Sequence, residues 1–154
     1  MFKHWAFISI FFFFLIPGSL RCETAPAFSL QDQHGYVKTV RFPSEKKTVL
    51  IIADRSSFKQ TTGWATAFIQ KGVSQNAYYA IAVLGDGPWF YKWVTRGFFT
   101  HKPSILLDWG GRISRKFQYQ KGICKLLLMD KDGTLICSES GPFSQKKWAR
   151  FKGY

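Results

Sequence analysis

The stretch Lys47–Trp64, KTVLIIADRSSFKQTTGW, predicts a buried strand that leads directly into a helix. Its first part, VLIIA, is a continuous apolar run rich in β-branched residues, which is typical of a strand covered on both faces. A strand-to-helix junction of this kind often carries a glycine-rich phosphate loop or a reactive cysteine. Neither is present between Ala53 and Trp64. The stretch therefore predicts the centre of an α/β sheet and leaves open what the junction does.

Strand and helix patterns alternate on both sides of this stretch. The first predicted elements are a β-hairpin (28–30 and 37–40), the central strand (47–53) and a helix with Trp64, Phe68 and Ile69 at helical spacing and Gly72 at its end. A strand (77–86), a helix with Trp89, Trp93 and Val94 along one face, and a strand (103–108) follow. The last elements are a short basic helix (GGRISRKFQ), a hairpin turned on DKDG, and a terminal helix (PFSQKKWARF). This order predicts an α/β fold with a central mixed sheet, helices on both faces and an N-terminal β-hairpin.

The first 22 residues have a different composition. The segment MFKHWAFISIFFFFLIPGSLRC has a basic start at Lys3, an apolar run over 5–16, and a Pro-Gly break. This layout is typical of a secretory signal peptide, and the run is shorter than the roughly 20 apolar residues of a spanning helix. We therefore expect residues 1–22 to be a signal peptide, with transient membrane contact only there, and residues 23–154 to form one domain. The protein is then periplasmic or secreted; an uncleaved N-terminal anchor is the alternative.

The chain is strongly basic. It has 22 Lys and Arg against 9 Asp and Glu, a net charge of +13 at pH 7. Lys3 and Arg21 lie in the predicted signal peptide, so residues 23–154 keep a net charge of +11. Such a charge favours anionic partners, for example an anionic envelope component. No zinc-finger spacing or RNA-binding signature is present, so we expect no nucleic-acid partner. Three scattered histidines predict no metal site, and no motif predicts a cofactor.

Four phrases of the sequence, in order along the chain, resemble the redoxin group of thioredoxin-fold proteins. They are APAFSLQDQHG, KTVLIIA, ILLDWGGRISRKFQ and LLLMDKDGTLI. The group spans the alkyl hydroperoxide reductase/thiol-specific antioxidant family, which includes the peroxiredoxins, and the exported thiol-disulfide thioredoxins. Together the phrases are spread over most of residues 23–154, in the order of the family. The resemblance implies a thioredoxin-like fold and oxidoreductase chemistry at the start of the helix after the central strand, where the family carries C-x-x-C or T-x-x-C.

This sequence departs from the family at that position. SFKQ (Ser57–Gln60) is closest to the C-x-x-C window and FKQT (Phe58–Thr61) to the T-x-x-C window, and neither contains sulfur. In the family, the helix N-terminus lowers the pKa of the thiol and supplies thiolate. The resemblance therefore implies a degenerate member without the catalytic cysteine, with a binding or structural role toward a protein partner. The aromatic residues that could form a contact surface are expected mostly to be core: Trp89, Phe90, Tyr91 and Trp93.

The residues at the junction have simpler roles available. Ser57 and Gln60 have the Ser-x-x-Gln spacing of a capping box, in which the serine hydroxyl and the glutamine side chain satisfy backbone N–H groups of the first helical turn. A serine nucleophile would need a general base, and no histidine has an evident route to Ser57. Arg55 and Lys59 could bind an anion at the helix N-terminus; the alternative is that both are solvated.

Two cysteines, Cys124 and Cys137, follow the predicted signal peptide. The resemblance places Cys124 near the position that faces the family's redox site, so an oxidoreductase working through Cys124, with or without Cys137, is an alternative function. The other interpretation is a small buried residue on a strand. A four-residue DKDG loop would place Leu126 opposite Cys137 and leave the cysteine Cα atoms roughly 7–8 Å apart. A disulfide needs less than about 7 Å, so pairing would require a shift in register.

Overall fold

The computed structural model describes residues 24–73, 78–100 and 103–151. The predicted signal peptide lies outside these residues and stays a prediction. The elements, in chain order, are β1 (Phe28–Asp32), β2 (Val37–Val40), β3 (Thr48–Ala53), the 3-10 turn η1 (Phe58–Gln60), α1 (Thr61–Gln70), β4 (Tyr78–Leu84), α2 (Trp89–Phe99), β5 (Ile105–Trp109), α3 (Arg112–Lys116), β6 (Lys125–Met129), β7 (Leu135–Ser140), α4 (Gln145–Trp148) and the 3-10 turn η3 (Ala149–Phe151). None of the described helices is both long and apolar enough to span a membrane.

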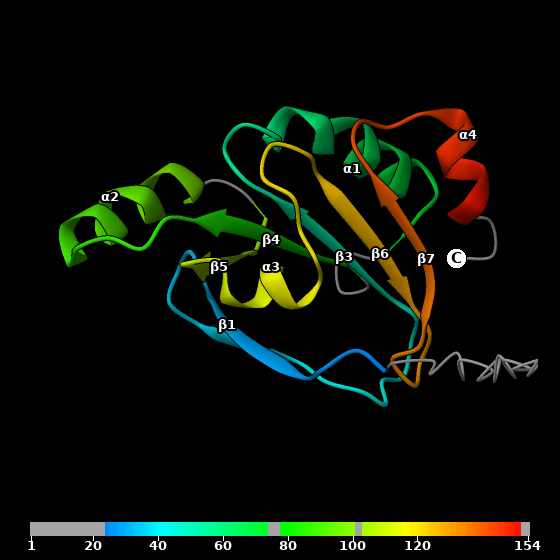
Figure 1. Ribbon diagram of the computed structural model, residues 1–154, viewed down its shortest axis with the longest axis horizontal. Helices are drawn as coiled ribbons and strands as arrows, with labels where there is room; N and C mark the ends of the chain where they lie inside the picture. The colour runs from blue at the N-terminus through cyan, green and yellow to red at the C-terminus, as the bar shows by residue number, and fades with distance from the viewer. Residues whose placement is uncertain (1–23, 74–77, 101–102, 152–154) are drawn as a thin grey trace, which may run out of the picture.

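The seven strands form one mixed sheet in the order β2-β1-β5-β4-β3-β6-β7 (Figure 1). Strand β3 is parallel to β4, and β4 is parallel to β5, whereas β6 runs antiparallel to β3. All six residues of β3 are buried, which is the burial that a continuous apolar run predicts for a central strand. The mixed sheet and the N-terminal hairpin β1–β2 are therefore confirmed.

Helices cover both faces of the sheet, as the sequence predicts. Val49 and Ile51 of β3 share a buried cluster with α1 and with the C-terminal turn η3. The alternate residues Leu50 and Ile52 point to the opposite face and share a cluster with Ile113 of α3. In Figure 1, α1 and α4 lie on one side of the sheet and α3 on the other. The period of two along β3 thus distributes its side chains between two separate cores.

Helix α1 packs through two aromatic residues one turn apart. Trp64 and Phe68 are both 0% exposed, whereas Ile69, which the sequence pattern places with them, is 63% exposed. Gly72 ends the helix with φ of +69°. Its N–H donates to Ile69 O at 2.9 Å, and the N–H of Val73 donates to Phe68 O at 3.1 Å. These two bonds form a Schellman motif, in which the left-handed residue is usually glycine.

The predicted register of the C-terminal hairpin is wrong by two residues. Cys137 lies opposite Leu128 rather than Leu126, and Leu126 lies opposite Glu139. One residue of the shift comes from the loop, where Asp130 N donates to Thr134 O at 2.8 Å and closes a three-residue loop instead of the expected four. The second residue comes from an irregularity of the β-bulge type in the β6–β7 pairing after Leu128.

The packing of α1 predicts a large difference between two neighbouring substitutions. We expect Phe68→Ala to lower the free energy of unfolding by about 3–5 kcal/mol, because it leaves a cavity under α1. Ile69→Ala, on the exposed side of the same turn, is the matched control and is expected to change it by less than about 0.5 kcal/mol. Urea unfolding followed by circular dichroism measures both values. Similar costs for the two variants would contradict this orientation of the helix.

Candidate functional site

The carboxylate of Asp54, directly after β3, organises the strand-to-helix junction. Its Oδ1 accepts hydrogen bonds from the Ser56 N–H at 2.9 Å, the Ser56 hydroxyl at 2.7 Å and the Ser57 N–H at 2.9 Å. Its Oδ2 accepts from the N–H of Gly122 at 2.8 Å. The Gly122 bond joins the junction to the loop before β6. Burial acts to raise the pKa of Asp54, but the hydrogen bonds from Ser56, Ser57 and Gly122 outweigh it and hold the pKa well below its ordinary value.

Ser57 is fully buried and belongs to this network. Its hydroxyl lies 3.0 Å from Asp54 Oδ1 and 2.9 Å from the Tyr119 hydroxyl. The Asp54 N–H donates to Ser57 Oγ at 3.0 Å and to the Tyr119 hydroxyl at 3.0 Å. Burial is the largest cause that raises the pKa of Tyr119, so its phenol stays protonated at neutral pH.

The predicted capping box at Ser57 and Gln60 is wrong. Ser57 precedes η1 but makes no side-chain cap hydrogen bond, and its φ of −95° and ψ of −4° are helical rather than extended. A capping serine needs an extended backbone for its hydroxyl to reach the first-turn N–H groups. The Gln60 side chain instead donates to Gly122 O at 3.0 Å and accepts from the Cys124 N–H at 3.1 Å. It therefore fixes the segment before β6 to the start of α1.

The structure thus brings the backbone of Cys124 next to the junction but turns its thiol away from it. Cys124 is 0% exposed and lies in the cluster under α1 with Trp64 and Phe68. Its Sγ donates to Gly141 O at 3.0 Å. Burial raises the pKa of the Cys124 thiol, and the opposing effects of the Lys147 ammonium and of the Gly141 bond are smaller. The thiol is therefore protonated and inside the core.

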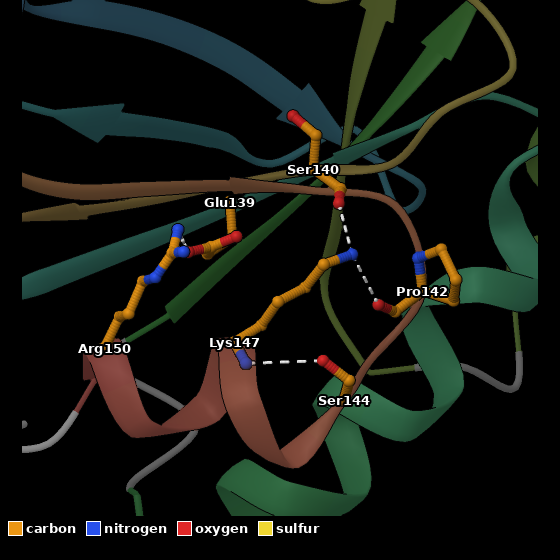
Figure 2. Close-up of polar contacts among 6 residues, drawn as sticks. All are labelled: Glu139, Ser140, Pro142, Ser144, Lys147 and Arg150. Carbon is orange, nitrogen blue, oxygen red and sulfur yellow. Dashed lines mark hydrogen bonds and ion pairs between the residues drawn. The ribbon is translucent and has the colours of Figure 1, made fainter.

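The C-terminal helix α4 holds the chain around Gly141 in place (Figure 2). The Lys147 ammonium donates to Ser140 O at 2.7 Å and to Pro142 O at 3.0 Å, the two carbonyls on either side of Gly141. Arg150 pairs with the buried Glu139 at 2.7 Å. These contacts attach the end of the chain to the end of β7, and so they keep the environment of the Cys124 thiol closed.

Three further residues of the sequence prediction take no part in the Asp54 network. Cys137 is half-buried on β7, and both it and Cys124 are free thiols. Burial, and then the charge of Glu139, raise the pKa of Cys137. The Thr61 hydroxyl donates to Phe58 O at 2.7 Å within the first helical turn. Lys59 is exposed. The described residues contain no group of three or more His, Cys, Asp or Glu side chains that could hold a metal ion.

An apolar groove of about 850 Å³ adjoins the junction. Its floor includes Ala53 of β3 with Ala82 and Leu84 of β4, and Phe58 contributes from η1. Helix α2 forms the opposite wall through five side chains: Tyr91, Val94, Thr95, Phe98 and Phe99. Three residues of the loops before η1 and β6 also line it: Arg55, Ser56 and Lys121. Arg55 and Lys59, predicted together as an anion site, therefore differ in position, because only Arg55 lines the groove.

Helix α2 packs differently from the prediction, which placed most of its aromatic residues in the core. Trp93 is 73% exposed and Phe90 is 56% exposed, whereas Thr95 is its only buried residue among the side chains that the structure describes. Phe99 packs against the cluster of Ala82 and Leu107. The polar side of α2 lies toward the sheet, where Thr95 is buried, Lys92 lies over the Trp109 ring and Arg96 donates to Gln31. The apolar side, which an amphipathic helix usually buries, is therefore left exposed. One consequence is an exposed apolar surface beside the groove.

Sequence comparisons give no relative: no family model and no curated protein matches the chain. Solved structures are similar in fold. A thiol-disulfide oxidoreductase from Bacteroides fragilis has 12% identity and a TM-score of 0.59 over 84% of this chain and 98% of that one. StoA from Bacillus subtilis has 16% identity and a TM-score of 0.57 over 80% and 94%. Peroxidoxin BcpB from Mycobacterium tuberculosis has 14% identity and a TM-score of 0.53 over 84% and 94%.

These similarities establish the fold class, which is thioredoxin-like, as the redoxin resemblance of the sequence implies. At such identities they establish the fold alone, because one fold carries many functions. The residues that sequence reasoning missed are Tyr119 and Gly122. Neither lies in a recognisable motif, and each meets the junction only through the fold.

The Asp54 network predicts a pH-dependent stability. We expect Asp54→Asn to lower the free energy of unfolding by about 1–2 kcal/mol at pH 7. This is the low part of the range for charged hydrogen bonds, since the carboxylate is partly exposed. Because the pKa of Asp54 is lower in the folded than in the unfolded chain, its contribution is complete at neutral pH. It is lost as the pH falls below the ordinary carboxyl value toward the depressed one.

Urea unfolding of the wild type and of Asp54→Asn at several pH values between about 7 and 2 measures this difference. The difference in free energy of unfolding between the wild type and Asp54→Asn should decrease steadily as the pH is lowered. Glu45→Gln, at an exposed carboxylate, is the control, and its free energy of unfolding should differ little from that of the wild type throughout the series. A gap for Asp54→Asn that does not change with pH would contradict a charged Asp54 as the centre of the network.

Proposed function

We propose that this protein is an exported thioredoxin-like binding protein that carries out no thiol-disulfide or peroxide chemistry at the β3–α1 junction. One observation carries the proposal: the place where the resembling family holds its thiol is filled by the Asp54 network. Residues Ser57–Thr61 contain no sulfur. The binding site is then the groove beside the junction. Its volume of about 850 Å³ lies within the range of about 300–1,000 Å³ that is usual for ligand pockets.

The surroundings of Ser57 also lack what thiol activation needs. A reactive thiol requires access to its substrate and an environment that stabilises its anion. Ser57 is fully buried, and its Oγ lies 3.0 Å from the Asp54 carboxylate. A negative charge at this distance disfavours a thiolate. The junction therefore differs from a redox site in its electrostatics as well as in its missing sulfur.

The alternative, an oxidoreductase working through Cys124, has less support. The Cys124 thiol is 0% exposed, and burial raises its pKa. Attack on a disulfide or a peroxide needs an accessible thiolate. Cys137 lies opposite Leu128 on β6, whereas Cys124 precedes β6 and bonds to Gly141, so Cys137 does not supply a neighbouring resolving thiol.

Export is supported by the composition of residues 1–22 and by the resemblance to a group with exported members. A second candidate function, electrostatic binding to an anionic envelope component, is supported by the net charge of +11 on residues 23–154 and by exposed cations at the junction, such as Arg55, Lys59 and Lys121. Binding of that kind weakens strongly as salt is added. A protein partner that docks on the exposed side of α2 is the remaining possibility for a binding role.

Activity assays test the central claim. We expect the purified protein to reduce insulin disulfides with dithiothreitol, and to consume hydrogen peroxide with a thiol donor, no faster than the protein-free blank. The reason is that neither candidate position presents a thiolate. Cys124→Ser is the matched control. Activity above the blank that this variant abolishes would establish the Cys124 alternative and overturn the proposal.

Thiol titration tests the burial of Cys124 separately. In variants that also carry Cys22→Ser, we expect the Cys124 thiol of Cys137→Ser to react with an aromatic disulfide reagent at least about a hundredfold more slowly than a free thiol, because reaction requires local opening of the core. The Cys137 thiol in Cys124→Ser should react faster, since it is only half-buried. Both should react at once in denaturant. A fast native reaction of Cys124 would contradict its placement.

A further inference from the structure

We propose that the groove binds a single-chain anionic amphiphile, with the hydrocarbon chain along α2 and the anionic head at Arg55 and Lys121. This inference rests on the proposed function as a binding protein and names its ligand class. The observation behind it is the division of the groove into an uncharged wall and a basic wall.

The uncharged wall suits a hydrocarbon chain. The side chains that α2 turns toward the groove include Val94, Phe98 and Phe99, and Leu84 lies on the floor. Phe98 is 77% exposed and Val94 is 47% exposed, so a chain lying against them would remove apolar surface from water. Burial of this kind contributes about 25 cal/mol per Å². An exposed apolar patch beside a concave site is typical of a binding surface.

The backbone around the groove argues for an acyl chain over an extended peptide. Strands β3 and β4 form the floor, and each is already paired on both sides within the sheet. No strand edge is therefore free there to accept an added peptide strand. A peptide would have to leave N–H and C=O groups unpaired against the hydrocarbon wall, which is costly. An acyl chain has no such groups to lose.

The basic wall selects the charge of the head group. Arg55 and Lys121 are exposed and make no hydrogen bond or ion pair within the described part of the chain. The acidic lining residue is Asp54, whose oxygens already accept bonds from Ser56, Ser57 and Gly122. Arg and Lys together can hold a carboxylate through charge-assisted hydrogen bonds. A cationic head would meet the net positive charge that Arg55 and Lys121 leave beside Asp54.

Calorimetric titration of the full chain with palmitate, below its micelle concentration, tests the proposal. We expect saturable binding with a Kd on the order of 1–10 μM. Hexadecyltrimethylammonium, an amphiphile of the same chain length with a cationic head, should bind at least about tenfold more weakly. Equal affinity for the two amphiphiles would overturn the role of the basic wall.

Matched variants locate the binding. Arg55→Glu/Lys121→Glu and Val94→Glu should each weaken palmitate binding about tenfold or more, one through the head and the other through the chain. The controls are Lys59→Glu, near the junction but outside the groove lining, and Trp93→Glu, next to Val94 on α2; both should bind like the wild type. Circular dichroism confirms that each variant is folded. Binding that neither groove variant weakens would place the amphiphile elsewhere and overturn the proposal.

The outcomes separate this inference from the function on which it rests. Absence of palmitate binding, together with blank thiol assays, overturns the amphiphile and leaves the non-redox binding protein in place. Disulfide or peroxide turnover that depends on Cys124 overturns the proposed function whatever palmitate does. Retention on phosphatidylglycerol vesicles without binding of free palmitate also overturns the groove site, in favour of electrostatic attraction to a charged surface.

Discussion

The complete burial of β3 is the constraint on which the rest of the structure depends. A strand covered on both faces requires a packing layer on each side, and α1 with η3 supplies one layer while α3 supplies the other. Because β3 lies between β4 and β6, its carboxyl end is flanked by a strand on each side. The chain must turn there, at Asp54, and enter α1. The junction and the groove are both consequences of that position.

Asp54 shows how the same local electrostatics can serve two purposes. Backbone N–H groups at the start of a helix stabilise a negative charge, and in the resembling family that charge is a thiolate. Here the N–H groups of Ser56, Ser57 and Gly122 stabilise a carboxylate. A carboxylate accepts several bonds at once and does no redox chemistry. The outcome is a fixed connection between the start of α1 and the loop before β6.

Helix α2 differs from α1 in how it uses its apolar residues. Trp64 and Phe68 anchor α1 in the core at one turn spacing, whereas α2 buries Thr95 and leaves Trp93 and Phe98 exposed. The space between α2 and the strands is the groove, and the basic loops at Arg55 and Lys121 adjoin it. The groove between α2 and the β3–α1 junction is thus a concave surface with an uncharged wall on α2 and a basic wall on the loops.

The sequence by itself determined the features that depend on local order. These are the run that forms β3, the spacing that orients Trp64 and Phe68, and the glycine that ends α1. Tertiary structure decided the contacts across the chain: Tyr119 meets Ser57 over a separation of 62 residues, and Gly122 meets Asp54 over 68. No local pattern encodes such pairs, because the sheet brings them together. The same holds for the hairpin register, which the three-residue loop and a bulge together shift by two residues. It also holds for the side of α2 that faces the sheet, because the polar side of the helix packs there and its apolar side is left exposed.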